Sequence, residues 1–168
     1  MAGAGARVVA LDRSPGRLRR LRENAQRLGL EDRVLVGAAL GEAPPLPPES
    51  MDRVLVDAPC TGTGTLARHP DARWRLEPSA IGALTEVQDR ILDGAAGVVR
   101  PGGILVYSTC TLEPEENGDR VRAFLARHPG FRLEEEHQVL PHQSGTDGAY
   151  AALVRREGPE DAKRGNER

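Results

Sequence analysis

Short runs of β-branched and aliphatic residues alternate along the chain with segments in which apolar residues recur at helical spacing. The first four runs lie at residues 6–11, 33–37, 53–57 and 104–109, and two later ones at 131–133 and 149–154. Short apolar runs bounded by turn residues are typical of buried parallel strands. Helical spacing predicts helices over residues 15–28, 79–98 and 121–128. Together they predict a doubly wound α/β sheet that ends in an antiparallel hairpin.

Proline, glycine and serine mark the ends of these elements. Ser14-Pro15 is a typical helix start, with serine as the cap, and Gly29 suits the C-terminal end of the same helix. A charged tail without apolar periodicity begins at Glu157, and we expect it to be disordered. The remaining loop and turn signals lie at residues 41–50, 58–78 and 100–103.

The composition is that of one globular domain, which we place at residues 1–156, with the tail at 157–168. Hydrophobic residues make up 39% of the 168 positions, and the net charge of −2 gives no global basic field. The low charge leaves RNA open as a substrate, because a local basic patch is enough. No apolar run approaches the roughly 20 residues that span a bilayer, so we expect no membrane association. Two widely separated cysteines and no signal peptide favour the cytoplasm.

The only two cysteines follow two of the predicted strands. Cys60 comes after the run that ends at Asp57, and Cys110 directly follows the run at 104–109. Ligands of open α/β sheets bind at the carboxyl ends of strands, so the two thiols face one pocket if the strands are neighbours. Burial as a small apolar residue is the alternative for each cysteine taken alone. Two thiols without further closely spaced ligands do not make a metal site.

Other polar residues stand near these strand ends. Asp12 ends the first run, where an acid of a nucleotide-binding fold accepts hydrogen bonds from ribose; a helix-dipole role is equally open. Arg68, Arg73 and Trp74 combine charge with an aromatic ring and are candidates for phosphate contact and base stacking. Two further sets have a structural interpretation: the acids Glu115 and Glu116 as helix-dipole partners, and the arginines of residues 13–27 as a solvated helix face.

Two motifs resemble those of one enzyme family. Residues 56–64, Val-Asp-Ala-Pro-Cys-Thr-Gly-Thr-Gly, followed by Arg68-His-Pro-Asp and Trp74, resemble motif IV of the Sun (RsmB-like) RNA cytosine-5 methyltransferases. Residues 107–117, Tyr-Ser-Thr-Cys-Thr-Leu-Glu-Pro-Glu-Glu-Asn, resemble motif VI. Residues 7–12 look like the ribose-binding strand, and residues 140–150 resemble the last conserved segment.

The resemblance implies a Rossmann-like class I methyltransferase fold, S-adenosyl-L-methionine as methyl donor, and an RNA substrate. Ribosomal RNA is favoured, tRNA is possible, and we expect a monomer. Cys110 would be the nucleophile that attacks the cytosine, Cys60 would assist release, and Asp57 would contact the cytosine or the cofactor. Asp12 would bind the ribose. The adenine position falls at Ala38, where the family usually has an acid.

One family element is missing from the sequence. The glycine-rich cofactor loop, close to Ala-Ala-Pro-Gly-Gly-Lys, follows a strand that would precede residue 6, and this sequence contains neither. That strand lies between the strands at 6–11 and 53–57 in the family, so two inner sheet edges would be left without a partner. We therefore expect the catalytic portion of a longer protein. Two alternatives stay open: an inactive remnant that binds RNA without catalysis or binds nothing, or a redox protein in which Cys60 and Cys110 form a reversible disulfide.

Overall fold

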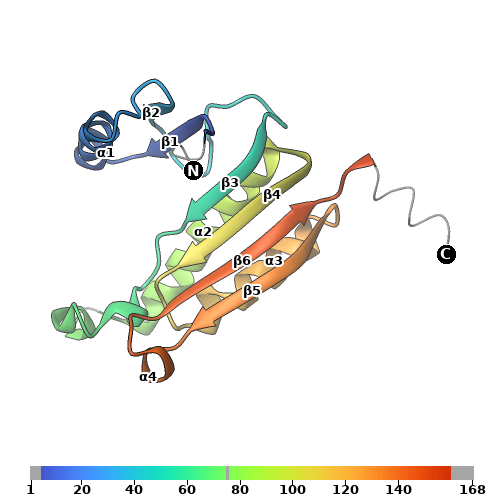
Figure 1. The fold of residues 1–168 in the computed structure, drawn as a ribbon. Helices are drawn as coiled ribbons and strands as arrows, with labels where there is room; N and C mark the ends of the chain where they lie inside the picture. The colour runs from blue at the N-terminus through green and yellow to red at the C-terminus, as the bar shows by residue number, and fades with distance from the viewer. Residues whose placement is uncertain (1–4, 75, 160–168) are drawn as a thin grey trace. The chain divides into compact units, whose positions relative to one another are not determined.

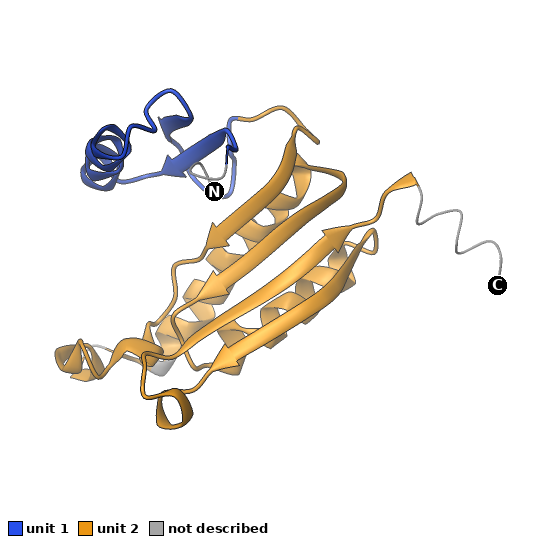
Figure 2. Cartoon of the chain, viewed as in Figure 1, with its two compact units in different colours: residues 1–45 blue, residues 46–168 orange. Residues whose placement is uncertain are grey.

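The computed structural model describes residues 5–74 and 76–159 (Figure 1). Its strands are β1 (Val8–Asp12), β2 (Val34–Ala38), β3 (Met51–Asp57), β4 (Val99–Thr109), β5 (Phe131–Val139) and β6 (Ala149–Arg156). Its α-helices are α1 (Pro15–Arg27), α2 (Pro78–Val98), α3 (Gly118–Arg127) and α4 (Pro141–Ser144). Short 3-10 helices are η2 (Thr63–Thr65), η3 (Pro70–Trp74) and η4 (Pro114–Glu116). The chain divides into two compact units, Met1–Pro45 and Leu46–Arg168 (Figure 2).

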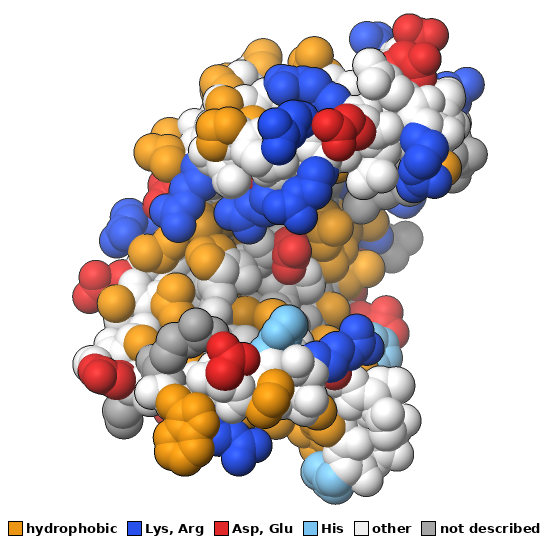
Figure 3. All heavy atoms as spheres, turned by 90° about the vertical axis from the view of Figure 1, so that its left-hand side faces the viewer, with side chains coloured by type: hydrophobic (Ala, Val, Ile, Leu, Met, Phe, Trp, Pro, Cys, Tyr) orange, Lys and Arg blue, Asp and Glu red, His pale blue; other side chains and the backbone are white. Residues whose placement is uncertain are grey.

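Unit 1 is a β-α-β unit in which β1 and β2 pair in parallel. Pro15 opens α1 as expected, but the Ser14 side chain makes no cap hydrogen bond; its backbone N–H donates to the Asp12 carboxylate at 2.7 Å instead. Gly29 follows the helix with φ of 63°, the left-handed conformation that glycine adopts freely. Arginine side chains gather over this unit (Figure 3), and the arginines of α1 are exposed, as a solvated face requires.

Unit 2 is a four-stranded mixed sheet in the order β3-β4-β6-β5. β3 and β4 are parallel, and β6 pairs antiparallel with both β4 and β5, so the expected terminal hairpin is confirmed. α2 and α3 cover one face of the sheet (Figure 1). β3 lies at one edge of this sheet, and β1 and β2 form a sheet of their own. Among the described residues, β1 and β3 therefore each have one edge without a partner, as the sequence predicts.

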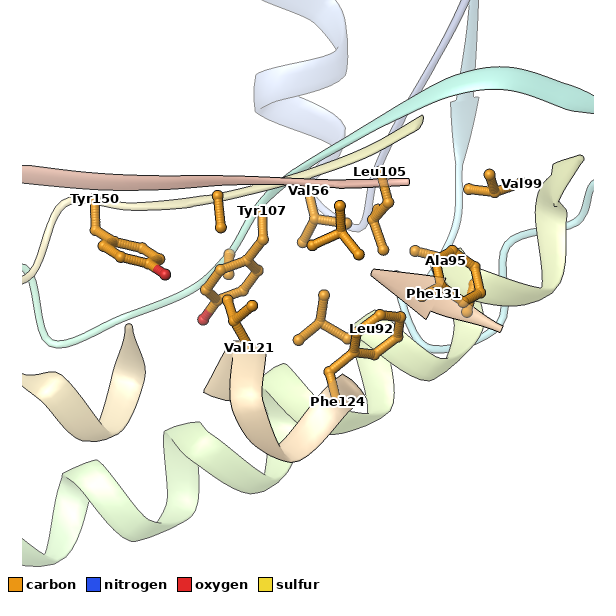
Figure 4. Close-up of a cluster of buried hydrophobic side chains, with 14 residues drawn as sticks. Val56, Leu92, Ala95, Val99, Leu105, Tyr107, Val121, Phe124, Phe131 and Tyr150 are labelled. Carbon is orange, nitrogen blue, oxygen red and sulfur yellow. The ribbon is translucent and has the colours of Figure 1, made fainter. Parts of the chain in front are cut away.

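The core of unit 2 lies between the sheet and these two helices (Figure 4). Alternate residues of β4 point into it, with Leu105 and Tyr107 completely buried. Leu92 of α2 and Phe124 of α3 meet them from the helix side. The phenol of Tyr107 needs a partner there, because a buried hydroxyl without one is costly. The packing of these side chains therefore fixes the position of the carboxyl end of β4.

Three local predictions need correction. Residues 100–103 are not a turn before the strand but part of β4, which bulges there: Met51 pairs with Val99 and Arg53 with Ile104. β5 extends to Val139, six residues beyond the predicted run. The stretch at 58–78 holds two short 3-10 helices and the start of α2. The tail from residue 160 lies outside the described residues, and a single catalytic domain over 1–156 stays a prediction.

Candidate active site

The carboxyl ends of β3 and β4 bring the two cysteines together. The strands are in parallel register with Asp57 opposite Ser108, and the Ala58 N–H continues the ladder to the Ser108 carbonyl at 3.0 Å. The segments that follow β3 and β4 then both leave the sheet at this end. The Sγ atoms of Cys60 and Cys110 lie 3.5 Å apart, and both thiols are free. The expected proximity of the thiols is confirmed; their roles stay predictions.

Close backbone contacts hold the loops around the thiols. Gly62 follows Cys60 with φ of 71°, which turns the chain back beside the Cys110 sulfur. The Gly64 N–H donates to the Cys110 carbonyl at 3.0 Å, and the Gly148 N–H donates to the Gly64 carbonyl at 2.8 Å. Three loops, after β3, after β4 and before β6, are thus tied to one another at a glycine pair where no side chain fits.

The two thiols have different surroundings. Cys110 is exposed, whereas Cys60 is half-buried. Burial raises the pKa of the Cys60 thiol to about 12, and the neighbouring Cys110 side chain acts in the same direction. The backbone N–H groups of Cys110 and Gly62 act in the opposite direction without cancelling the effect of burial. Cys60 therefore keeps its proton at neutral pH, and Cys110 is the sulfur that a large ligand can reach.

A line of threonine hydroxyls links the two cysteine loops. The Thr61 hydroxyl donates to the Glu116 carboxylate at 2.5 Å, so the Thr111 hydroxyl, 2.8 Å from it, must be the donor between them. Thr63 then donates to Thr111 at 2.9 Å and accepts from the Leu112 N–H at 2.9 Å. Hydrogen bonds ordered in one direction polarise one another and strengthen the line.

Glu116 and Gln88 were missed by sequence reasoning as parts of this site. The helix-dipole interpretation does not account for the contacts of Glu116: it is completely buried and accepts hydrogen bonds from the backbone of Thr61 and the amide of Gln88. Gln88 is also completely buried, in the middle of α2. A polar residue on the apolar face of a predicted helix was the available signal. Glu115 is exposed, and its helix-dipole interpretation stays a prediction.

The predicted cofactor residues lie in both units. Asp12 and Ala38 are register partners at the carboxyl ends of β1 and β2. The Asp12 carboxylate accepts from the Ser14 N–H and pairs with Arg17 at 3.1 Å. Asp57 is exposed at the end of β3, three residues before Cys60.

The predicted RNA-contacting residues lie on the segment after η2. The Arg68 side chain is largely exposed and pairs with Asp147 at 2.9 Å, next to the Gly148 contact described above. Arg73 and Trp74 are in η3, and the Trp74 ring is 84% exposed. Over the described residues, no three His, Cys, Asp or Glu side chains are placed to hold a metal ion.

The family model described as 16S rRNA methyltransferase RsmB/F matches residues 1–155. The chain belongs to this family. Ribosomal RNA small subunit methyltransferase B of Vibrio vulnificus (strain YJ016) is 42% identical over 153 residues, covering 88% of this chain and 36% of that protein. The chain thus spans about a third of the length of the curated relatives it matches.

Solved structures show the same fold. A crystal structure of the protein PH0851 has a TM-score of 0.82 and 34% identity, covering 89% of this chain and 37% of that chain. NSun6 from Pyrococcus horikoshii, determined with SFG, has a TM-score of 0.79 and 31% identity, covering 89% of this chain and 41% of that chain. The RsmB/F chain therefore has the Rossmann-like methyltransferase fold expected from its motifs. Over the residues described, no helix is long and apolar enough to cross a membrane.

Proposed function

We propose that this chain carries the catalytic site of an RNA cytosine-C5 methyltransferase that acts on ribosomal RNA. The observation that carries the proposal is the pair of thiols 3.5 Å apart at the ends of two parallel strands, one exposed and one half-buried. Membership in a family described by 16S rRNA methylation supports the substrate class. The cytosine chemistry rests on the two cysteine motifs.

Cys110 is the nucleophile in this proposal. Its thiolate attacks carbon 6 of the cytosine, which forms an S–C6 bond and moves the C5–C6 π electrons onto carbon 5. S-adenosylmethionine, when bound, supplies the methyl group to that carbon. Removal of the C5 proton by a base then restores the double bond and expels the sulfur. A thiolate suits these steps because it is both a strong nucleophile and a good leaving group.

Cys60 assists the release step. Its raised pKa keeps it protonated at neutral pH, so it does not compete with Cys110 for the ring. Its sulfur is close enough to the Cys110 sulfur to exchange a proton with it as the S–C6 bond breaks. Asp57, which is exposed three residues before Cys60, would contact the edge of the base or the cofactor.

The residues of unit 1 fit the ribose of the cofactor. A carboxylate has about four acceptor positions, and two on Asp12 are used by the Ser14 N–H and Arg17. The remaining ones can accept from ribose hydroxyls. Ala38, across the register from Asp12, offers the adenine an apolar contact in place of a hydrogen bond.

Arg68, Arg73 and Trp74 would hold the RNA beside the target base. The exposed Trp74 ring suits stacking on an unpaired base, and an RNA phosphate can compete with Asp147 for Arg68. The target cytosine itself has to leave its stack to reach Cys110.

Covalent trapping tests the proposal. The chain is incubated with S-adenosylmethionine and 16S ribosomal RNA that contains 5-fluorocytosine, in which the fluorine blocks loss of the C5 substituent. We expect an adduct stable in denaturing gels, lost in Cys110→Ala and kept in Cys60→Ala. With ordinary RNA, Cys60→Ala should accumulate the adduct because its release is slowed. An adduct that persists in Cys110→Ala, or none with any form of the chain, would reject the proposal.

A further inference from the structure

Two consecutive residues, Glu116 and Asn117, reach both cysteine loops from one turn. Both are buried, at the end of η4 and the start of α3. The Tyr107 hydroxyl donates to the Glu116 carbonyl at 2.7 Å, which fixes the backbone of the turn against β4. In the described part of the chain, neither side chain makes a hydrogen bond to a sulfur. Their contacts are with the residues on either side of each cysteine.

Glu116 acts on the Cys60 side. Its carboxylate accepts from the Thr61 N–H, at 3.0 Å and 3.2 Å to its two oxygens, and from the Thr61 hydroxyl. It also accepts from the Gln88 amide at 3.0 Å, and the same amide nitrogen donates to the Pro59 carbonyl at 2.9 Å. The peptide groups on both sides of Cys60 are therefore anchored to a buried Glu116–Gln88 pair.

The orientation of Gln88 supports this reading. Its amide oxygen has no hydrogen-bond partner among the described residues, although it is buried. Turning the amide over would place that oxygen against two acceptors, the Pro59 carbonyl and the Glu116 carboxylate. In the observed orientation the amide oxygen is unpaired, and the amide nitrogen donates to both the Pro59 carbonyl and the Glu116 carboxylate. No described cation pairs with Glu116 either, so amide and hydroxyl donors alone compensate its burial.

Asn117 acts on the Cys110 side in the same manner. Its amide nitrogen donates to the Thr111 carbonyl at 3.1 Å, and its oxygen accepts from the Thr109 hydroxyl at 2.5 Å. Thr109 and Thr111 are the residues on either side of Cys110. One dipeptide thus brackets both cysteines through their chain neighbours.

We propose that Glu116 and Asn117 form a clamp that sets the separation of the Cys60 and Cys110 thiols. They are positioning residues, since they act through Thr61, Thr109 and Thr111. The proposal rests on the proposed function for the use made of the thiol pair, but its geometric content is independent of methylation. Parallel pairing brings the strands to one edge; the clamp fixes where the sulfurs stand after the chain has left the sheet.

A trivalent arsenical measures the thiol separation directly. Phenylarsine oxide condenses with two thiols, forming two As–S bonds and releasing one water, and it binds tightly only where both sulfurs reach one arsenic. We expect Glu116→Gln to weaken its binding about tenfold, because losing one acceptor frees the Thr61 backbone and lowers the effective concentration of the second thiol. Cys60→Ala should bind far more weakly, as a single-thiol reference.

Glu115→Gln is the matched control, because it removes the same charge from the neighbouring residue, whose side chain is exposed. It should bind the arsenical like the parent chain. Circular dichroism establishes that each variant is folded at the assay temperature, and the unfolding midpoint is measured alongside. If Glu116→Gln does not fold, Asn117→Asp, which loses the donor to the Thr111 carbonyl, gives the same test from the Cys110 side.

Unchanged arsenical binding in a folded Glu116→Gln chain with a lowered unfolding midpoint would overturn the clamp and leave Glu116 a structural residue. Equal weakening in Glu115→Gln would overturn it as well. Because the assay uses neither RNA nor cofactor, its failure is separate from that of the methylation proposal. Tenfold weakening without any RNA adduct would support the clamp and reject only the proposed function.

Discussion

Gly64 is the position where a single methyl group should do most damage to the cysteine loops. A Cβ atom there would overlap the Gly148 carbonyl oxygen and lie 2.8 Å from the Cys110 carbonyl oxygen. Both obstacles are backbone atoms, which cannot rotate away as the end of a side chain can. The φ of Gly64 is not positive, so the expected effect of Gly64→Ala is steric and not conformational.

The size of the effect follows from the contacts that must open. Overpacking by a methyl group costs about 1–3 kcal/mol. The backbone hydrogen bonds from Gly64 to Cys110 and from Gly148 to Gly64 lengthen as the loops separate, and each contributes roughly 0.5–1.5 kcal/mol to the free energy of unfolding. We therefore expect Gly64→Ala to lower the free energy of unfolding by about 2–6 kcal/mol. For a chain of this length that corresponds to a fall of roughly 4–24 °C in the midpoint.

Thermal and urea unfolding followed by far-ultraviolet circular dichroism provide the measurement. Gly82→Ala is the control, because Gly82 lies in α2 with nothing within 4 Å of the added Cβ. That change should stabilise the chain by about 0.5–1 kcal/mol through helix propensity. If Gly64→Ala were as stable as the parent, the close approach of the three loops would be refuted.

Two further predictions concern buried groups of the site. In the Cys110→Ser variant, thiolate absorbance at 240 nm should show that Cys60 stays protonated well above the ordinary thiol pKa of 9.0, because burial is the largest cause of its raised pKa. In the unfolded chain the same thiol should titrate near 9.0. Equal titration curves for the folded and unfolded chains would contradict the burial of Cys60. Since the unfolded thiol loses its proton first, this group lowers the free energy of unfolding as the pH rises from 9.0 towards about 12. Tyr107→Phe leaves the buried Glu116 carbonyl without its donor and should lower the free energy of unfolding, measured with urea, by about 1–3 kcal/mol. Tyr150→Phe should lower it less, because the hydrogen bond from the Tyr150 hydroxyl to the Glu136 carboxylate is only partly buried. The reverse order would count against the Tyr107 hydrogen bond.

The strands that carry the cysteines could be predicted because burial and sequence pattern coincide in them. The runs at 54–56 and 104–107 are apolar, and the structure packs alternate residues of each against α2 and α3. β5 could not be predicted in full for the opposite reason. Only its Phe131 is buried, and its other residues are exposed at a sheet edge. Cross-strand partners hold it instead, such as Arg155 with Glu134 at 2.5 Å, and a pairing of this kind leaves no apolar alternation to detect.

The sequence correctly predicts a turn-like backbone within residues 100–103, but it does not show that a strand continues through them. Gly102 has φ of 75°, as in a turn, yet β4 continues through it because the bulge opposite Asp52 absorbs the extra residues. The burial of Glu116 was hidden in a similar way. Its partners are 28 and 55 positions away in the chain, at Gln88 and Thr61, so nothing in its local sequence distinguishes it from Glu115.

The motifs place two chemically identical side chains at equivalent strand ends, and so they cannot by themselves say which one attacks. The structure makes the difference through surroundings: Cys60 lies half-buried between two anchored peptide groups, and Cys110 lies at the surface. A nucleophile must reach a bulky base, whereas a group that handles a proton needs only to reach the other sulfur. In the proposed mechanism, the different roles of the two thiols therefore follow from the loops after β3 and β4, and the residues that hold those loops would belong to the site as much as the cysteines do.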